Sequence, residues 1–171
     1  MRRCRVNGEC KEKMSDRRRD NMKYLAVILG IFGLETGIKG HIEKTKTEQT
    51  NEKICGGALL IRKHHNRGAF LNAGEKKQKL VMLVSVILTV ILTVVFLLTL
   101  GTAGKGLLKW GLTLLLGGAY TNTYDRLKRK YVVDYVSFNV PVKAVRRIVF
   151  NIGDFCIMIR ALLATAGYLQ E

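Results

Sequence analysis

Cysteine, histidine and proline are scarce in this sequence, with 4, 3 and 1 residues respectively among 171. Cys4 and Cys10 are separated by five residues, which is not a common zinc spacing, and no third ligand pattern lies near His64 and His65. We therefore expect free thiols and solvated histidines, and we predict neither a metal site nor a disulfide framework.

Residue patterns for nucleophilic and phosphate chemistry are missing as well. Ser85 and Ser137 are the only serines near the apolar segments, and neither has a suitable histidine partner. No glycine-rich loop precedes a helix with the lysine and hydroxyl residues that bind phosphate. These absences argue against a serine hydrolase and a nucleotide-binding protein, and no cofactor is predicted.

Acidic residues are few, since 13 Asp and Glu are outnumbered by 29 Lys and Arg, which gives a net charge of +16. This excess could suggest a nucleic-acid partner. The basic residues, however, gather beside the apolar segments, at 2–23, 39–79 and 126–147. Attraction to anionic lipid head groups is the simpler interpretation, and no nucleic-acid partner is predicted.

Apolar residues, in contrast, are abundant and come in blocks. Residues 80–100 carry no charge, and they correspond to about 31 Å of helix, which is enough to cross a bilayer core. The blocks predict a mainly α-helical, polytopic membrane protein, with a disordered basic tail at 1–21 and one membrane domain at 22–171. Four transmembrane spans are predicted, at about 24–41, 80–100, 105–121 and 148–168.

The segments between the spans predict a small β-rich region. Residues 54–72 alternate enough apolar and polar side chains to form short strands, whereas 44–53 are expected to form a mobile loop. Residues 126–140 are too polar to cross a membrane. Their β-branched and aromatic residues around Asp134 favour an extended segment, which Pro141 ends.

Polar residues concentrate between residues 117 and 154, beside the apolar blocks. Carboxylates next to membrane spans are costly, so Asp125, Asp134 and Asp154 are candidate functional residues. An even number of spans would place them on the same side of the membrane as the predicted strands. Gly117 and Gly118 at the start of this stretch indicate close helix packing.

Two of these carboxylates could perform catalysis together. When two carboxyl groups lie close and are partly desolvated, one keeps its proton while the other acts as a base, and the pair can activate a water molecule. We assign these roles to the pair Asp134 and Asp154. Asn122 and Asn151 would hold the carboxylates and the substrate backbone, and Asn151 shares a helix face with Asp154. The pattern predicts peptide-bond hydrolysis without a metal.

Glu35 and Lys39 lie four residues apart in the first predicted span and share one helix face. An ion pair at the membrane interface is the simpler interpretation of this spacing. The alternative is a pair that faces a functional site and orients a group there.

Five sequence blocks resemble those of the lipoprotein signal peptidase (signal peptidase II) family, and they occur in that family's order. The three stronger blocks are GGAYTNTYDR at 117–126, YVVDY at 131–135 and FNIGD at 150–154. The two weaker ones are LETGIK at 34–39 and HNRGAF at 65–70. Together they extend over most of the chain, which makes the resemblance specific.

The resemblance implies a multi-pass enzyme of the bacterial inner membrane, with four transmembrane helices and a small extracytoplasmic β-rich cradle that holds the site. Such an aspartic endopeptidase removes the signal peptide from diacylglyceryl-modified prolipoproteins, just before the lipidated cysteine. Its partners would be these prolipoproteins and membrane lipids, and we expect a monomer. The implied catalytic dyad is Asp134 and Asp154, and the implied substrate-binding or supporting residues are Glu35, Lys39, Asn66, Asn122, Asp125, Arg126 and Asn151.

The sequence departs from the family pattern at a few positions. Glu35 replaces the expected Asp, Thr121 stands where Gly is usual, Gly153 stands where Ala is usual, and the block at 65–70 is one Ala short. Both dyad carboxylates are nevertheless present. Two alternatives stay open, namely a non-catalytic lipopeptide-binding protein of the same fold and a small transporter or proton carrier.

Overall fold

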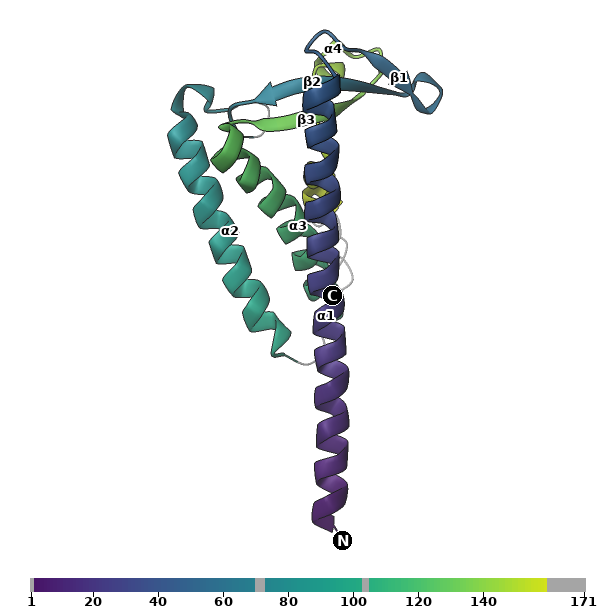
Figure 1. Cartoon of the computed structure of the whole chain (residues 1–171), viewed down its shortest axis with the longest axis vertical. Helices are drawn as coiled ribbons and strands as arrows, with labels where there is room; N and C mark the ends of the chain where they lie inside the picture. Colours follow the sequence, from purple (N-terminus) through teal and green to yellow (C-terminus); the bar gives the residue numbers. More distant parts are fainter. Residues whose placement is uncertain (1, 70–72, 103–104, 160–171) are drawn as a thin grey trace.

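Three long helices and a small antiparallel sheet make up the described part of the chain, residues 2–69, 73–102 and 105–159 of a computed structural model. The sheet lies across one end of the helices, and α1 continues well past the other end of α2 (Figure 1). This confirms a mainly helical fold with a small sheet. The elements are α1 (Arg2–Thr45), β1 (Glu52–Ile54), η1 (Cys55–Gly57), β2 (Leu59–Asn66), η3 (Glu75–Lys77), α2 (Gln78–Leu100), α3 (Gly106–Arg129), β3 (Val132–Phe138) and α4 (Lys143–Arg146).

The first helix, α1, begins much earlier than the sequence suggests. It starts at Arg2 and therefore includes residues 2–21, for which we predicted a disordered tail. This segment contains no proline and is rich in Arg, with Lys and Glu in addition, and these side chains lose little rotamer freedom in a helix. Because extending an existing helix is much easier than starting one, the apolar part of α1 can propagate into these residues.

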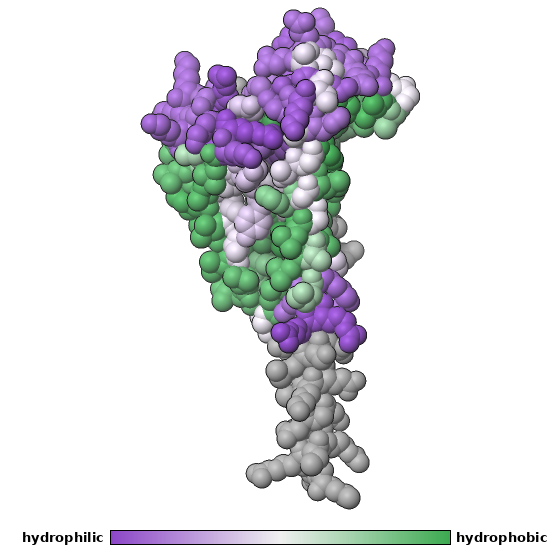
Figure 2. Space-filling model, in the orientation of Figure 1, coloured by the Kyte–Doolittle hydropathy of each residue, from purple (hydrophilic) through white to green (hydrophobic). Residues whose placement is uncertain are grey.

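Two helical stretches are long and apolar enough to cross a membrane, Arg18–Thr45 and Glu75–Leu100. They coincide with the first and second predicted spans. Large apolar side chains on α2 point outward, with Leu97 and Leu98 exposed by 57% and 70%. On the face shown in Figure 2, an apolar belt covers the helices below a polar cap over the sheet, as is expected of a protein surrounded by a bilayer.

The third predicted span coincides with α3, which continues past residue 121 to Arg129. It packs against α1 through Gly117, where an added Cβ would lie 2.8 Å from Ile31. It is joined to α2 by hydroxyl pairs such as Thr89 with Thr123, whose oxygens lie 2.8 Å apart. Close backbone approach and interhelical hydrogen bonds are the main attractions between helices in lipid. The close packing predicted at Gly117 is thus confirmed.

The sheet has the order β1–β2–β3, and both pairs of neighbours are antiparallel. The strand predicted within 54–72 is confirmed as β2, and the extended segment predicted around Asp134 is confirmed as β3. Residues 70–72 of the first segment lie outside the described part of the chain. In contrast, β1 begins at Glu52, inside the predicted mobile loop, because it pairs with Ile61 and its neighbours on β2. The register places His64 of β2 opposite Asp134 of β3.

The last described helix begins at residue 152, not at 148 as we predicted. Phe150 forms an additional bridge with Val136 of β3, in which its N–H donates to the Val136 carbonyl at 2.7 Å. This backbone pairing keeps 148–151 out of the helix, because a helix would need the same hydrogen-bonding groups. The helix is described as far as residue 159, so Arg160 and the end of the fourth predicted span lie outside the described residues.

Candidate active site

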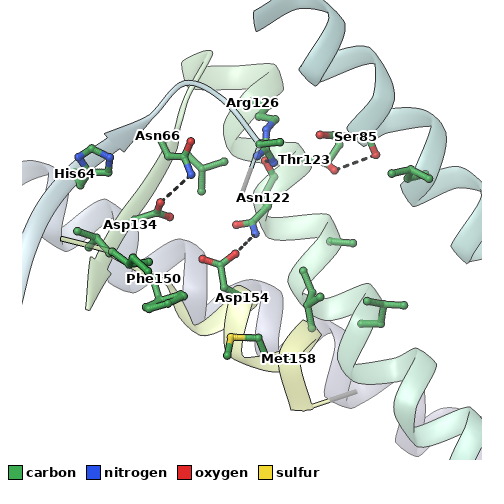
Figure 3. A pocket seen from close by; sticks show the side chains of 18 of the residues that line it. His64, Asn66, Ser85, Asn122, Thr123, Arg126, Asp134, Phe150, Asp154 and Met158 are labelled. Atoms are coloured by element: carbon green, nitrogen blue, oxygen red, sulfur yellow. Dashed lines mark hydrogen bonds between the residues drawn. The ribbon is translucent and has the colours of Figure 1, made fainter. Parts of the chain in front are cut away.

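A cavity of about 850 Å³ lies between the helices next to the sheet. Its apolar wall comes from the membrane-facing elements, and its polar end lies where β2, β3 and the head of the last helix meet (Figure 3). The apolar wall includes Leu88, Leu92, Leu115, Ile157 and Met158, and the polar end includes Asn66, Asn122, Arg126, Asp134 and Asp154.

Asp134 projects into this cavity from β3. Successive side chains of a strand alternate between its two faces, so Asp134 points to the cavity while Val133 and Tyr135 pack with Ile42 of α1 on the other face. Asp134 is 2% exposed, and its carboxyl group accepts two amide hydrogen bonds. The Asn66 amide donates to Oδ2 at 3.1 Å, and a second amide donates to Oδ1 at 2.7 Å.

That second amide belongs to Asn151, which also holds Asp154. Asn151 caps the last helix, because its Oδ1 accepts the Asp154 backbone N–H at 2.9 Å. In return, the Asn151 backbone N–H donates to Asp154 Oδ2 at 3.1 Å. This reciprocal arrangement is a capping box, and it needs the three-residue spacing that the sequence shows. One fully buried residue thus contacts both carboxylates of the proposed dyad.

The proximity of the two carboxylates has an electrostatic consequence. Burial, followed by the nearby charge of Asp154, raises the pKa of Asp134 to about 7. The hydrogen bonds from Asn151 and Asn66 act in the opposite direction but are weaker in total. The pair can therefore hold one proton near neutral pH, which is the state that acid and base catalysis by two carboxylates requires.

A buried ion cluster supports Asp154 from behind. Lys39 of α1 is fully buried, with its Nζ 3.3 Å from Glu35 Oε1 and 3.1 Å from Asp125 Oδ2. It also donates to the Asn122 side-chain oxygen at 2.8 Å, and the Asn122 amide donates to Asp154 Oδ1 at 3.1 Å. The simpler interpretation of Glu35 and Lys39 as an interfacial pair was wrong, because the pair lies inside the protein and continues into the site.

Asp125 and Arg126 hold different parts of the site in place. Asp125 is 2% exposed, and in addition to Lys39 it contacts Arg129 at 3.4 Å and the Val133 backbone N–H at 3.4 Å. It therefore ties the end of α3 to the start of β3. Arg126 lines the cavity and donates to the Gly68 carbonyl at 3.0 Å, which fastens the loop after β2.

The structure thus brings all nine predicted site residues into one connected region. Two come from α1, one from β2, three from α3, one from β3 and two from the start of the last helix. They are Glu35, Lys39, Asn66, Asn122, Asp125, Arg126, Asp134, Asn151 and Asp154.

Sequence reasoning missed other residues of this region. Tyr135 is buried, and its hydroxyl lies 3.1 Å from Glu35 Oε2. His64 lines the cavity on the same sheet face as Asn66, which lies two residues further on, so strand alternation could have identified it. The expectation that both histidines are solvated was wrong for His65. Its side chain is 20% exposed, lies 3.1 Å from Glu43 and stacks on Tyr131.

Two departures from the family pattern meet in space. A Cβ added to Gly153 would lie 3.1 Å from Thr121 Oγ1 and 2.9 Å from Asn151 Oδ1. A threonine at 121 and an alanine at 153 would therefore crowd each other and the helix cap. Glycine at 153 thus avoids a close contact with Thr121 and with the side chain that caps the helix.

Comparisons with known proteins give a consistent result. Residues 27–169 match the family Peptidase_A8, described as Signal peptidase (SPase) II. A lipoprotein signal peptidase of Caldicellulosiruptor bescii is 32% identical over 151 residues, 88% of this chain and 93% of that protein. One of Clostridium tetani is 33% identical over 106 residues, 62% of this chain and 66% of that protein.

Solved structures show the same fold. A bacterial membrane enzyme determined by the in meso method at 2.3 Å resolution superimposes with a TM-score of 0.74 at 21% identity, over 86% of this chain and 88% of that one. A second bacterial membrane enzyme, determined by the same method at 1.9 Å, has a TM-score of 0.70 at 20% identity, over 87% of this chain and 94% of that one.

Proposed function

The chain belongs to the signal peptidase II family, and on this premise we propose that it is an aspartic endopeptidase that removes the signal peptide from diacylglyceryl-modified prolipoproteins, immediately before the lipidated cysteine. The observation that supports this most directly is the shared contact of Asn151 with Asp134 and Asp154. It holds two carboxylates at the polar end of an apolar cavity.

In the proposed mechanism the two carboxylates share one proton. Asp154 takes a proton from a water molecule, and the resulting hydroxide attacks the scissile carbonyl carbon. Asp134 donates its proton to the carbonyl oxygen, which gives a neutral tetrahedral intermediate. On collapse, Asp154 passes its proton to the leaving amine as the C–N bond breaks, and Asp134 recovers the hydroxyl proton. No metal or covalent intermediate is needed.

The cavity supports a lipidated substrate. Its wall is built from leucine, isoleucine and methionine side chains of α2, α3 and the last helix, and these suit acyl chains. The peptide would lie at the polar end, where Asn66, Asn122 and Arg126 provide hydrogen bonds. A substrate that carries acyl chains and a peptide on one cysteine fits a site with an apolar wall and a polar end.

We place the protein in the bacterial inner membrane as a monomer with four spans and the sheet at the extracytoplasmic face. The apolar belt and the two membrane-length helices support insertion in a bilayer. Prolipoproteins present their cleavage site on the outer side of this membrane, so the cavity must open there. The basic residues around the sheet then lie at lipid head-group level.

The decisive experiment is cleavage of a synthetic diacylglyceryl prolipoprotein by the purified full-length protein in detergent or lipid. We expect cleavage before the lipidated cysteine, and a loss of about 10²- to 10⁴-fold in rate for Asp134→Asn and for Asp154→Asn. Binding of the peptide without cleavage would favour the non-catalytic alternative. Ion flux in liposomes without cleavage would favour a transporter.

A further inference from the structure

The phenol of Tyr135 joins the buried ion cluster to the first turn of the last helix. Its hydroxyl donates to Glu35 Oε2 at 3.1 Å and accepts the Ile152 backbone N–H at 3.4 Å. Tyr135 is 3% exposed and Glu35 is fully buried, so neither contact competes with solvent. Burial, followed by the charge of Glu35, raises the pKa of this phenol, so the hydroxyl keeps its proton and remains a donor.

The Ile152 N–H is one of the groups at a helix start that have no partner within the helix. Asn151 supplies the side-chain cap for Asp154, and Tyr135 supplies a partner for Ile152 from another element. Phe150, just before the cap, is paired with the backbone of Val136 on the same strand. The start of the helix is therefore held on β3 by backbone pairing and by the Tyr135 hydroxyl.

Asp134 and Tyr135 are neighbours on β3 and point to opposite faces. Asp134 lines the cavity, whereas Tyr135 packs with Ile42 and Val133 against α1. Tyr135 cannot touch a substrate in the cavity from that side. Its contacts, however, reach the helix that carries Asp154 and the Glu35–Lys39 pair that supports Asn122.

We propose that Tyr135 is a positioning residue that sets the separation of Asp134 and Asp154 by fixing the head of the last helix to β3 and to Glu35. This inference rests on the proposed function. It also explains a role for glutamate at position 35. One Glu35 oxygen contacts Lys39, while the other accepts the hydrogen bond from the Tyr135 hydroxyl.

The test compares Tyr135→Phe with Tyr131→Phe. Both changes remove one hydroxyl that donates to a glutamate, but Tyr131 donates to Glu43, at 3.0 Å, at the end of α1 and away from the cavity. We expect Tyr135→Phe to lower kcat by about 10- to 100-fold with KM within about twofold of the wild-type value, and Tyr131→Phe to leave both close to wild type.

The pH profile separates positioning from general destabilisation. The charged groups that act on Asp134 are Asp154, Lys39 and Arg126, and the titratable His64 lies opposite it on β2. If Asp154 moves away from Asp134 in Tyr135→Phe, the charge of Asp154 raises the pKa of Asp134 by less than it does in the wild-type protein. In the pH profile of kcat/KM, the decline at alkaline pH should then occur at lower pH in Tyr135→Phe and at the wild-type pH in Tyr131→Phe.

Hydrogen exchange of the backbone amides at 150–154 gives a readout that does not depend on activity. We expect faster exchange in Tyr135→Phe than in wild type and no change in Tyr131→Phe. If the wild-type protein does not cleave the substrate, the proposed function is refuted. The hydrogen-exchange comparison then still tests whether Tyr135 holds the start of the last helix. Unchanged exchange, or a folded Tyr135→Phe with wild-type kcat and pH profile, overturns the inference.

Glu35→Asp provides a second route if Tyr135→Phe does not fold. The shorter acid keeps its charge but cannot reach both Lys39 and Tyr135 as Glu35 does. We expect the same fall in kcat and the same pH shift, and little further loss when Tyr135→Phe is added. A Glu35→Asp variant with wild-type kcat and pH profile contradicts the proposal.

Discussion

At the scale of single residues, Asn151 performs several tasks with one side chain and one backbone amide. Its amide holds Asp134, its side-chain oxygen caps the last helix, and its backbone N–H holds Asp154. Asn151 and Asp134 are buried, so water cannot easily replace the hydrogen bond between them when one partner is removed. Helix capping and the geometry of the proposed dyad are therefore linked in this protein.

Asn151→Ala removes the cap and one hydrogen bond to Asp134. We expect a loss of about 1–3 kcal/mol in the free energy of unfolding, together with a drop of about 10²-fold in cleavage rate. Denaturant unfolding and the prolipoprotein assay measure the two effects. Asn139→Ala is a suitable control, because its amide donates to the Gly57 carbonyl at 2.7 Å, away from the cavity, so only stability should fall. A normal rate in Asn151→Ala would contradict the bridging role.

Asp134 should make the fold less stable as pH rises. Its pKa is about 7 in the folded protein against an ordinary value of 3.8, so the folded state binds the proton more tightly than the unfolded state. Stability from this group is fully present below pH 3.8 and is lost as pH increases to about 7.

Asp134→Asn removes this titration. We expect the variant to be inactive but to have a higher Tm than wild type at pH 8, with a smaller advantage at pH 5. The comparison of the two proteins at each pH cancels the titration of other groups. An advantage that does not change with pH would mean that Asp134 is ionised as easily as an exposed carboxyl group.

At the scale of elements, the site depends on how closely three helices approach one another. Gly118 of α3 lies against the backbone of the last helix, and a Cβ added there would lie 2.4 Å from the Gly153 carbonyl oxygen. Gly117, one residue earlier, meets α1 instead. Two adjacent glycines thus let α3 contact a different helix on each side, and α3 carries Asn122 to Asp154.

Gly118→Ala should separate α3 from the last helix, because the neighbour is backbone and cannot rotate away. We expect a loss of about 1–3 kcal/mol in stability and reduced cleavage. Gly30→Ala is the matched control, since a Cβ at Gly30 meets nothing within 4 Å, and it should be neutral or slightly stabilising. Thermal unfolding in detergent compares the two, and equal stability would rule out the close contact.

At the scale of the whole molecule, the apolar belt and the polar cap over the sheet define how the protein would sit in a bilayer (Figure 2). The sheet end carries the cavity and the proposed dyad, so the side of the membrane on which it lies would determine which substrates can reach the site. The exposed thiol of Cys55, in the turn after β1, marks that end.

Labelling of Cys55 tests the proposed orientation. In a variant with Cys4 and Cys10 replaced by Ser, a membrane-impermeant maleimide should react with Cys55 in intact spheroplasts. The buried Cys156 should contribute little, and Cys55→Ser controls for it. Reaction only in inverted membrane vesicles would place the sheet, and the site with it, in the cytoplasm.

Local sequence patterns determined much of this protein. Residues 80–100 had to form a membrane-length helix because no charge interrupts them, and alternation around Asp134 predicted a strand that points this carboxylate away from its neighbours. The spacing of Asn151 and Asp154 predicted that the two side chains lie on one helix face, and in the structure they form the capping box. Such features depend on residues a few positions apart, which sequence alone displays.

Only the tertiary structure decided which distant groups meet. It placed Lys39 inside the site, gave Tyr135 its two partners, and set Thr121 against Gly153. These contacts join elements that lie far apart in the chain, and they depend on helix approach distances and on strand register. No local pattern records those quantities, because they result from packing all the elements together at once.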